Sequence, residues 1–307
     1  MEIAKLLDER KRIENRLETL IFGSIEIREQ GNKKLIYVHY RADGMQRSKY
    51  VGEYSIDLYN VILENNNLAR GYKRRLREIK KLLAKENYIE ETINHDVALN
   101  IDLARKNLVD SIYKQAILEG VATTYSDTET LVNEGRVHNM NATDVQKIIN
   151  LKRAWEFILL EGVIEYPSNF DVLSQINAIV EEGMSYEAGK IRNVPVTIGG
   201  SSYRPPLPFE GQVKMDIASI VESKKPVLDR AIDALLYVKK KQVFLDGNKR
   251  TAVIFANHIL IKHAGGIIVI PAELVEEYKK LLIHYYETDE KNDIIGFLKK
   301  YCFKPVK

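Results

Sequence analysis

A short run in the C-terminal third of the chain combines residue types that bind metal-bound phosphates. Residues 243–251 read VFLDGNKRT and precede the apolar helical stretch AVIFANHILI. Gly247 can adopt backbone angles denied to other residues, and the first N–H groups of the following helix lack internal partners, so the turn is a natural anion site. Lys249 and Arg250 add positive charge, and Asp246 can hold a divalent cation that bridges phosphate oxygens. The structural interpretation of the same residues is an Asp-Gly turn, an N-cap and a basic helix start.

This run resembles the active-site loop of the Fic/Doc family, which reads His-Pro-Phe-x-Asp/Glu-Gly-Asn-Gly/Lys-Arg. Two more stretches occur in the family's order. Residues 196–206 (VTIGGSSYRPP) are similar to the target-positioning flap, and residues 130–135 (TLVNEG) match the Ser/Thr-x-x-x-Glu-Gly/Asn pattern of the inhibitory helix. The resemblance covers roughly residues 110–300.

The resemblance implies a helical domain that binds ATP with Mg²⁺ and transfers AMP to a Ser, Thr or Tyr hydroxyl of a target protein. It implies that Asp246 holds Mg²⁺ and that Phe244 anchors the loop in the core. The nucleotide-binding residues that it implies are Gly247, Asn248, Lys249 and Arg250, with Arg250 on the distal phosphates.

Two further roles follow from the resemblance. The flap residues Thr197, Ile198, Gly199 and Gly200 are expected to pair by main-chain hydrogen bonds with an extended target segment, as in β-augmentation. Glu134 occupies the position of the inhibitory glutamate, which in relatives restrains a second arginine. That arginine is Val253 in this chain. Glu134 therefore pairs with Arg250 or Lys249 instead, or it is an ordinary helix carboxylate.

The catalytic position of the motif departs from the family. Gln242 replaces the histidine that takes the proton from the target hydroxyl, and Val243 replaces the following proline. Glutamine has no group that accepts a proton near neutral pH, and general-base catalysis is typically worth about 10²–10⁴-fold. We interpret His258 and His263, which lie beyond the loop, as structural or solvated residues, and Lys241 would need a strongly lowered pKa to act as the base.

Three functions stay open at this point. The first is AMP transfer, at a reduced rate or absent because of Gln242. The second is a catalytically inactive domain that binds a nucleotide or a partner as a regulator. The third is transfer of the terminal phosphoryl group, because the variant Asn-Lys-Arg-Thr at residues 248–251 resembles the Doc branch.

Charge is distributed unevenly along the 307 residues. Residues 1–87 hold 19 Lys and Arg against 13 Asp and Glu, a net of +6, whereas the whole chain has a net charge of +3. This asymmetry indicates that the N-terminal part meets something anionic. With 45% hydrophobic and 29% charged residues, the composition is that of an ordinary globular protein and excludes a disordered chain.

The N-terminal part is predicted to be a small α+β module. Periodicity predicts a helix over residues 2–20 and a helix over 55–85 with a break at Asn65-Asn66-Asn67, with a three-stranded meander between them over 21–52. The turns of the meander are Gln30-Gly31-Asn32 and Asp43-Gly44.

Basic and aromatic residues alternate in this module. The basic residues are Arg70, Lys73, Arg74, Arg77, Lys80 and Lys81 on the helix and Lys33, Lys34, Arg41, Arg47 and Lys49 on the sheet, beside Tyr37, His39, Tyr40, Tyr50 and Tyr54. One interpretation is a nucleic-acid surface that tracks phosphates and stacks on bases. The other is a solvated helix face whose tyrosines pack against the first helix.

The remainder of the chain is predicted to be a helical domain. Helices are expected over 91–119, 143–161, 170–182, 210–222, 226–241, 248–264, 272–286 and 290–300. Prolines and glycines in 189–208 favour an extended, hairpin-like flap inside this domain. We therefore predict a mainly α protein, with a small α+β module at 1–88 followed by a Fic-like helical domain with a β-hairpin flap at 89–307.

Three further expectations concern the setting of the protein. No apolar run reaches the roughly 18 residues of a spanning helix, and the N-terminal stretch lacks the apolar segment of a signal peptide, so we expect a cytoplasmic protein with no membrane partner. The single cysteine, Cys302, cannot form an internal disulfide. The oligomeric state is left open, with a homodimer among the alternatives.

Overall fold

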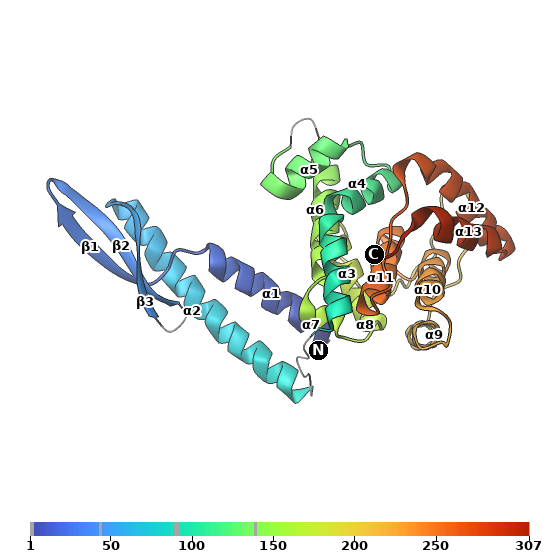
Figure 1. Ribbon diagram of the computed structural model, residues 1–307, viewed down its shortest axis with the longest axis horizontal. Coiled ribbons are helices and arrows are strands. Elements are labelled where there is room, and N and C mark those ends of the chain that lie inside the picture. The colour runs from blue at the N-terminus through green and yellow to red at the C-terminus, as the bar shows by residue number, and fades with distance from the viewer. Residues whose placement is uncertain (1–2, 43–44, 87, 89–92, 138–139, 307) are drawn as a thin grey trace. The chain divides into compact units, whose positions relative to one another are not determined.

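Residues 1–89 form one unit of the computed structural model and residues 90–307 form a second (Figure 1). The structure describes residues 3–42, 45–86, 88, 93–137 and 140–306. The expected turn at Asp43-Gly44 lies outside these residues. Among the described residues, no helix is long and apolar enough to cross a membrane.

The N-terminal unit consists of two helices and a three-stranded antiparallel sheet in the order β1-β2-β3. Its elements are α1 (Ile3–Thr19), β1 (Ser24–Gln30), β2 (Lys33–Ala42), β3 (Met45–Glu53) and α2 (Ile56–Lys85). One face of the sheet packs on α2, with Ile36 and Val38 of β2 buried against Ile62. The predicted helix, meander and second helix are confirmed.

The predicted break at Asn65-Asn66-Asn67 is wrong, because α2 runs through these residues without interruption. Asparagine favours turns when its side chain bonds to its own backbone. Here the Asn66 side chain accepts from the Gly23 backbone N–H at 2.8 Å and donates to the Gly23 carbonyl at 3.0 Å. Asn65 donates to the carbonyl of Ile21 at 3.1 Å. Both side chains hold the connection between α1 and β1, which leaves the helix backbone intact.

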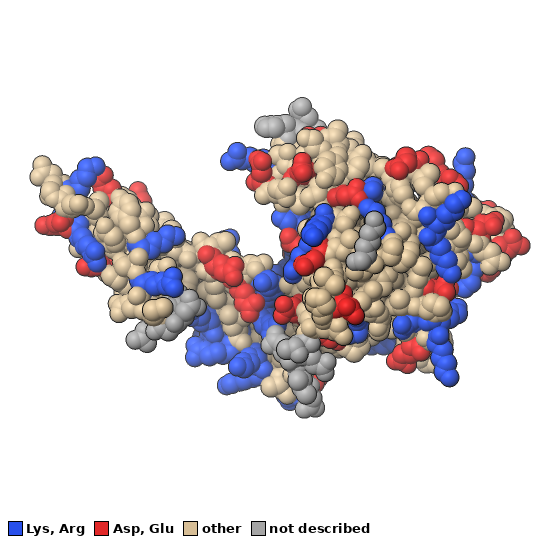
Figure 2. All heavy atoms as spheres, in the orientation of Figure 1, with Lys and Arg blue, Asp and Glu red and all other residues tan. Residues whose placement is uncertain are grey.

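Two sheet tyrosines, Tyr37 and Tyr50, pack against each other on the sheet. Tyr37 and Tyr50 are paired across β2 and β3, their ring centres are 5.5 Å apart, and Tyr50 is 52% exposed. The Arg28 guanidinium lies 4.4 Å from the centre of the Tyr37 ring. Figure 2 shows Lys and Arg side chains gathered along α2.

The second unit is helical, and its strands are two residues long. The helices are α3 (His95–Lys106), α4 (Leu108–Leu118), α5 (Tyr125–Glu134), α6 (Ala142–Ile158), α7 (Glu161–Ile164), α8 (Phe170–Val180), α9 (Glu210–Val221), α10 (Val227–Lys241), α11 (Asn248–Lys262), α12 (Val275–Thr288) and α13 (Asn292–Phe297). A 3₁₀ turn, η1 (Ala272–Leu274), precedes α12, and a π-helical turn, η2 (Leu298–Cys302), follows α13. Strand β4 (Ile267–Ile268) pairs with β5 (Phe303–Lys304). The single helix expected over 91–119 is two helices, α3 and α4, that meet at Asn107.

Helix α11 forms the centre of this unit. Every residue from Thr251 to Ile261 is buried, and α10, α8, α6 and α3 all contact the helix. A helix that is apolar all round must be buried on every side. Asn257, which is also buried, binds both the N–H and the carbonyl of Ile268 and so attaches β4 to the helix.

The histidines beyond the motif agree with the structural interpretation. His258 is fully buried, with Nδ1 2.9 Å from the Ser168 hydroxyl and Nε2 2.9 Å from the Val163 carbonyl oxygen. Burial lowers the pKa of His258 to about 4, so the ring is neutral at physiological pH. His258 therefore joins α11 to α7 and to the segment before α8.

The flap region is extended, but it forms no strand ladder. Residues 192–209 contain a turn at Gly199–Gly200, and the neighbouring Ile191 makes an isolated bridge with Phe244. Prolines within the segment lack the N–H that a ladder needs. The predicted β-hairpin is therefore an extended loop in this structure, and a buried arginine attaches that loop to the domain.

Arg192 fixes both ends of this loop. Its side chain is 3% exposed and donates to the carbonyls of Gln242 (2.6 Å), Val194 (2.8 Å) and Pro206 (2.7 Å). Val194 lies at the beginning of the loop, Pro206 lies at its end, and Gln242 directly follows α10. One guanidinium thus connects the loop to the motif that carries the candidate chemistry.

The variant Arg192→Met is expected to release the loop. Removal of the charged donor leaves buried carbonyls unpaired, so we expect a loss of at least about 2 kcal/mol of unfolding free energy. Limited proteolysis should show faster cleavage between residues 193 and 207. The matched control is Arg204→Met, because Arg204 is exposed and, within the part of the chain that the structure describes, donates only to the nearby carbonyls of Ser201 and Tyr203. Equal cleavage of both variants would contradict the role of Arg192.

Candidate active site

The loop between α10 and α11 is closed by the amide of Asn248. Asn248 is 3% exposed, its Oδ1 accepts from the Phe244 N–H at 2.9 Å and its Nδ2 donates to the Phe244 carbonyl at 2.7 Å. Phe244 is itself fully buried, as the sequence predicted for the loop anchor. The Asn248 side chain therefore stabilises the loop through these hydrogen bonds. The backbone N–H of Asn248 is the group that can bind a ligand.

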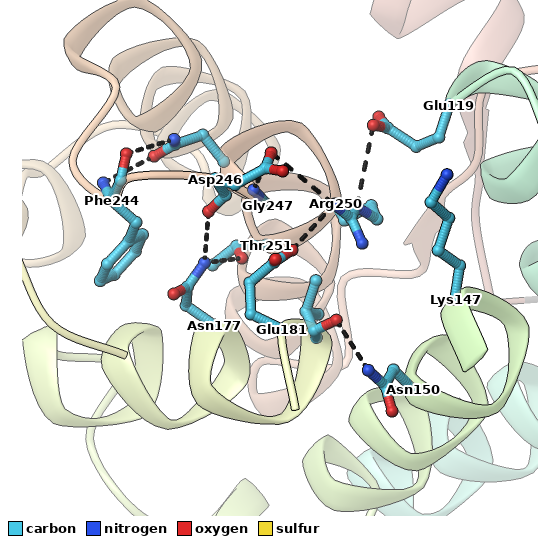
Figure 3. A network of polar contacts seen from close by, with 12 residues as sticks. Glu119, Lys147, Asn150, Asn177, Glu181, Phe244, Asp246, Gly247, Arg250 and Thr251 are labelled. Carbon is cyan, nitrogen blue, oxygen red and sulfur yellow. Dashed lines mark hydrogen bonds and ion pairs between the residues drawn. The ribbon is translucent and has the colours of Figure 1, made fainter. Parts of the chain in front are cut away.

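Gly247 is required by a close approach between this loop and α8. Its φ angle is +74°, and a Cβ at this position would lie 2.5 Å from Glu181 Oε1 and 3.0 Å from Asn177 Nδ2. Asn177 donates to the Asp246 carbonyl at 3.0 Å and to the Thr251 hydroxyl at 3.1 Å. Helix α8 thereby fixes the turn that begins α11 (Figure 3).

Arg250 lies at the centre of a group of carboxylates. Its side chain is 4% exposed, and its Nη2 is 2.8 Å from Glu181 Oε1 and 3.8 Å from Asp246 Oδ1. Its Nε is 3.8 Å from Glu119 Oε2, at the end of α4 (Figure 3). The buried Nε and Nη1 atoms make no hydrogen bond with the described residues. Arg250 therefore balances buried negative charge from α4 and α8.

Glu181 is the most deeply buried of these carboxylates, with its side chain 2% exposed. Burial raises the pKa of Glu181 to about 7; Arg250 opposes this shift, and the charges of Asp246 and Glu119 add to it. Lys147 on α6 also opposes it. The carboxyl of Glu181 consequently changes charge near physiological pH, directly behind the motif.

Lys239 adds a second buried cation close to this network. Its side chain is fully buried on α10, and its Nζ lies 5.0 Å from the centre of the Tyr278 ring. Burial lowers the pKa of Lys239 to about 7, and the charge of Glu119 opposes that shift. Glu119 therefore faces Arg250 and Lys239 together.

Asp246 and Lys249 are the charged motif residues that reach solvent. The Asp246 side chain is 72% exposed, and its Oδ1 accepts from the Gly247 N–H at 2.6 Å. Lys249 is half-buried and makes no ion pair with any described residue. Its place in the first turn of α11 puts its charge beside the backbone N–H groups of residues 248–250, for which no acceptor is found among the described residues.

A magnesium site here would need the nucleotide as well as the protein. The described residues contain no group of three or more His, Cys, Asp or Glu side chains that could hold a metal ion. Mg²⁺ is usually bound through one or two carboxylates together with substrate phosphates and water. The exposed carboxylate of Asp246 beside a cationic helix start fits that pattern.

Gln242 ends α10 in a strained conformation and makes structural hydrogen bonds. Its φ angle is +47°, in the left-handed region, which a non-glycine residue enters at a cost. Its Nε2 donates to the Lys239 carbonyl at 2.6 Å, and its Oε1 accepts from Asn248 Nδ2 at 3.2 Å. The amide thus connects α10 to the motif.

The other predicted site residues lie apart from this group. Glu134 is the last residue of α5 and is exposed, and Arg250 pairs with Glu119, Glu181 and Asp246 and not with Glu134. The inhibitory role of Glu134 stays a prediction. Residues 197–200 are joined to the motif indirectly, through Arg192 and the Gln242 carbonyl. Ile198 is buried, which holds the middle of the loop against the domain.

Sequence reasoning missed four residues that build the site: Asn177, Glu181, Glu119 and Arg192. Asn177 and Glu181 are spaced by four at the end of a largely buried helix, so they share one face, and this signal was available in the sequence. Glu119 and Arg192 have no comparable local signal, because their partners are distant along the chain.

Comparison with known proteins identifies the domain. Residues 167–260 match the model of the Fic/DOC family. The chain carries a Fic/DOC family domain. The matched range includes α8, the flap, α10 and most of α11, so Asn177, Glu181 and the motif all lie inside the Fic/DOC domain.

One curated relative of this chain is the protein adenylyltransferase fic-1 of Caenorhabditis elegans. The two are 23% identical over 214 residues, which is 67% of this chain and 41% of the relative. The matched region is thus less than half of the relative's length.

Several solved structures share the fold of this chain. A variant of a Fic-1 fragment from C. elegans has a TM-score of 0.57 and 16% identity, with 80% of this chain and 81% of that chain covered. A Fic-domain signaling protein from Bacteroides thetaiotaomicron has a TM-score of 0.51 and 19% identity, with coverages of 72% and 90%. A Fic family protein from Desulfovibrio desulfuricans has a TM-score of 0.52 and 17% identity, with coverages of 68% and 72%. At these identities the likeness shows a mainly helical Fic fold.

The raised pKa of Glu181 predicts a pH-dependent stability. The folded state keeps this proton up to about pH 7, whereas the unfolded chain releases it near the ordinary value of 4.5. The stabilisation is therefore fully present below 4.5 and is lost as the pH rises through about 7. Glu181→Gln stays neutral, so its stability relative to the native chain should increase by about 3 kcal/mol across that window.

Denaturant unfolding at pH values below and above this window measures the difference. Glu187→Gln is the matched control, because the Glu187 side chain is 52% exposed and, among the described residues, its carboxylate pairs only with Lys190, three residues along the chain. We expect the control to show no such increase. A Glu181→Gln variant that loses stability relative to the native chain as the pH rises would show that the ion pair with Arg250 outweighs burial.

Proposed function

We propose that the chain binds ATP with Mg²⁺ at the start of α11 and transfers AMP to a hydroxyl side chain of a target protein, at a rate limited by Gln242. The observation that carries the proposal is that an exposed carboxylate, Asp246, and a cation, Lys249, flank the first N–H groups of α11, and neither Lys249 nor these N–H groups have a partner among the described residues. The name of the C. elegans relative, a protein adenylyltransferase, supports the same activity.

The proposed phosphate-binding site consists of the backbone N–H groups of residues 248–250 and the Lys249 side chain. The N–H groups of residues 248–250 point out of the first turn of α11, where the helix dipole favours negative charge. Lys249 supplies a full positive charge there. Arg250, which the sequence assigned to the distal phosphates, is instead buried between Glu181 and Glu119. We assign it to positioning the turn and assign direct phosphate contact to Lys249.

Asp246 is the residue that would hold the Mg²⁺ of the nucleotide. When bound, the ion neutralises phosphate charge and so makes the leaving group better. Asp246 is kept in place by its own Oδ1, which accepts from the Gly247 N–H, and by Asn177, which binds its carbonyl. One contact comes from the turn and the other from α8, so Asp246 is oriented before the nucleotide arrives.

The transfer step is a displacement at the α-phosphorus. The target hydroxyl oxygen forms a bond to that phosphorus, the bond to the pyrophosphate oxygen breaks, and pyrophosphate leaves. The hydroxyl proton must go to water, because the Gln242 amide cannot take it and is held by Lys239 and Asn248. Without a general base the rate falls by about 10²–10⁴-fold, and positioning supplies the remaining acceleration.

The flap would present the target. No hydrogen bond is found among the described residues for the backbone N–H groups of residues 197–200, which are therefore available to an extended segment. Such a segment adds to the loop by main-chain hydrogen bonds, while Arg192 holds the loop at the motif. We infer that the target is a cytoplasmic protein with an exposed Ser, Thr or Tyr.

Transfer of the terminal phosphoryl group is the second candidate. Lys249 favours it, because a lysine at this position is the feature by which the motif resembles the Doc branch. The two reactions differ in which phosphate reaches the target. An inactive, nucleotide-binding regulator is the outcome if neither phosphate is transferred.

Label transfer from ATP distinguishes these functions. ATP labelled at the α or the γ phosphate is incubated with target-containing lysate and either the native chain or Gln242→His. We expect α label on protein, increased by about 10²–10⁴-fold in the histidine variant because the base is restored. Glu134→Gly is measured in parallel to test the inhibitory role.

The matched control is Gln242→His combined with Asp246→Asn, which keeps the base and removes the carboxylate. Label from γ alone would establish phosphorylation instead of AMP transfer. If no variant transfers either label while a known Fic enzyme labels the same lysate, the proposal fails and the regulator remains.

Calorimetry with ATP tests the metal assignment separately. Asp246→Ala should remove the dependence of ATP affinity on Mg²⁺, because no other exposed carboxylate of the motif can replace it. Asp293→Ala, which removes an exposed carboxylate at the start of α13, should retain that dependence. Unchanged Mg²⁺ dependence in Asp246→Ala would remove the assignment.

A further inference from the structure

The N-terminal unit contains a cleft that the proposed transfer reaction does not use. It lies between the three-stranded sheet, the connection from α1 to β1 and the middle of α2, and its volume is about 970 Å³. Apolar side chains from all three parts line it, among them Ile21, Val38 and Leu63. A cavity of this size accepts a ligand as large as a nucleotide.

Cations also line this cleft. They are Lys49 from the sheet and Arg70 and Lys73 from α2, against one acidic lining residue, Glu18 at the end of α1. None of the three forms an ion pair with a residue that the structure describes, and Lys73 Nζ lies 4.7 Å from the centre of the Phe22 ring. Unneutralised positive charge beside an apolar cavity favours a ligand that has both an anionic and an apolar part.

The positive charge continues along α2 beyond the cleft. Arg74, Arg77 and Lys81 follow Arg70 at spacings of four, three and four residues, so they lie on one face of the helix. Arg75 lies off this row, where it is held by Glu9 at 2.7 Å. Residues 70–85 contain eight Lys and Arg and one acidic residue, Glu78. Figure 2 shows this blue surface on the lower side of α2.

Aromatic rings supply the apolar part of the recognition. Phe22, Tyr40 and Tyr59 line the cleft, and Tyr40 is 37% exposed. Nucleobases stack on such rings without sequence preference, and neighbouring cations strengthen the contact. The cleft thus combines a stacking surface with the beginning of a cationic row.

We propose that this cleft and the row of Arg70, Lys73, Arg74, Arg77 and Lys81 bind single-stranded nucleic acid. A base enters the cleft and stacks beside Tyr40, and the phosphates that follow it run along α2. A duplex keeps its bases stacked inside and presents only phosphates to the row, so it cannot fill the cleft. This function is independent of the nucleotide site in the second unit.

Fluorescence anisotropy of the full chain with a labelled oligothymidylate of about 16 nucleotides tests the proposal. Affinity should fall steeply between about 50 mM and about 200 mM salt, because each phosphate contact contributes about 0.7 to the slope of log K against log salt. Arg74→Ala with Arg77→Ala should reduce that slope by about 1.4. Lys190→Ala with Lys279→Ala removes the same charge from the second unit and should leave the slope unchanged.

The aromatic contact is tested by Tyr40→Ala. Loss of one stacked base should weaken single-strand binding by about ten-fold while the salt slope stays constant. Tyr186→Ala is the matched control, because Tyr186 is a fully exposed tyrosine of the second unit. Circular dichroism of each variant shows whether the N-terminal unit is still folded.

Three results would overturn the proposal. The first is no binding at the lower salt concentration. The second is binding of a blunt duplex as tight as that of the single strand, with no effect of Tyr40→Ala. The third is displacement of the oligonucleotide by phosphatidylserine vesicles at lower phosphate concentration than by unlabelled strand, which would identify the surface as a membrane site.

Discussion

Arg250 at the start of α11 is the charge on which the arrangement of the second unit depends. Two helices place carboxylates around it, Glu119 from the end of α4 and Glu181 from the end of α8, and its side chain is 4% exposed. An isolated buried charge of either sign would be very costly, so the three groups must be buried together or not at all. This requirement determines where α4 and α8 end relative to α11 and requires a glycine at 247, where any side chain would meet Glu181.

The same constraint separates two tasks within the motif. The buried residues, Asn248 and Arg250, hold the shape of the turn, whereas the solvent-facing Asp246 and Lys249 remain available to a ligand. Gln242 belongs with the first group, because its amide joins the end of α10 to Asn248. The Gln242 amide therefore supports the shape of this turn, and it has no group that accepts a proton near neutral pH.

The order of elements and the motif were predictable, and the long-range contacts were not. Hydrophobic periodicity predicted the N-terminal helix, the meander and most of the later helices, and the turn at 246–248 followed from residue types alone. The predicted break at 65–67 failed because Asn65 and Asn66 bind residues 21 and 23, more than 40 positions away. The phosphate role of Arg250 stays a prediction, and nothing local in the sequence indicates that Glu119 and Glu181 reach this side chain. Polar residues on a buried helix, such as Asn177 and Glu181, are the sequence signal that indicates long-range contacts with the motif.

A crystal structure with Mg²⁺ and a non-hydrolysable ATP analogue tests the division of roles within the motif most directly. The account predicts phosphate oxygens on the N–H groups of residues 248–250 and on Lys249, the metal on Asp246, and Arg250 still paired with Glu181 and Glu119. Phosphates bound by an Arg250 that has left both carboxylates, or a nucleotide that binds elsewhere on the chain, would contradict it.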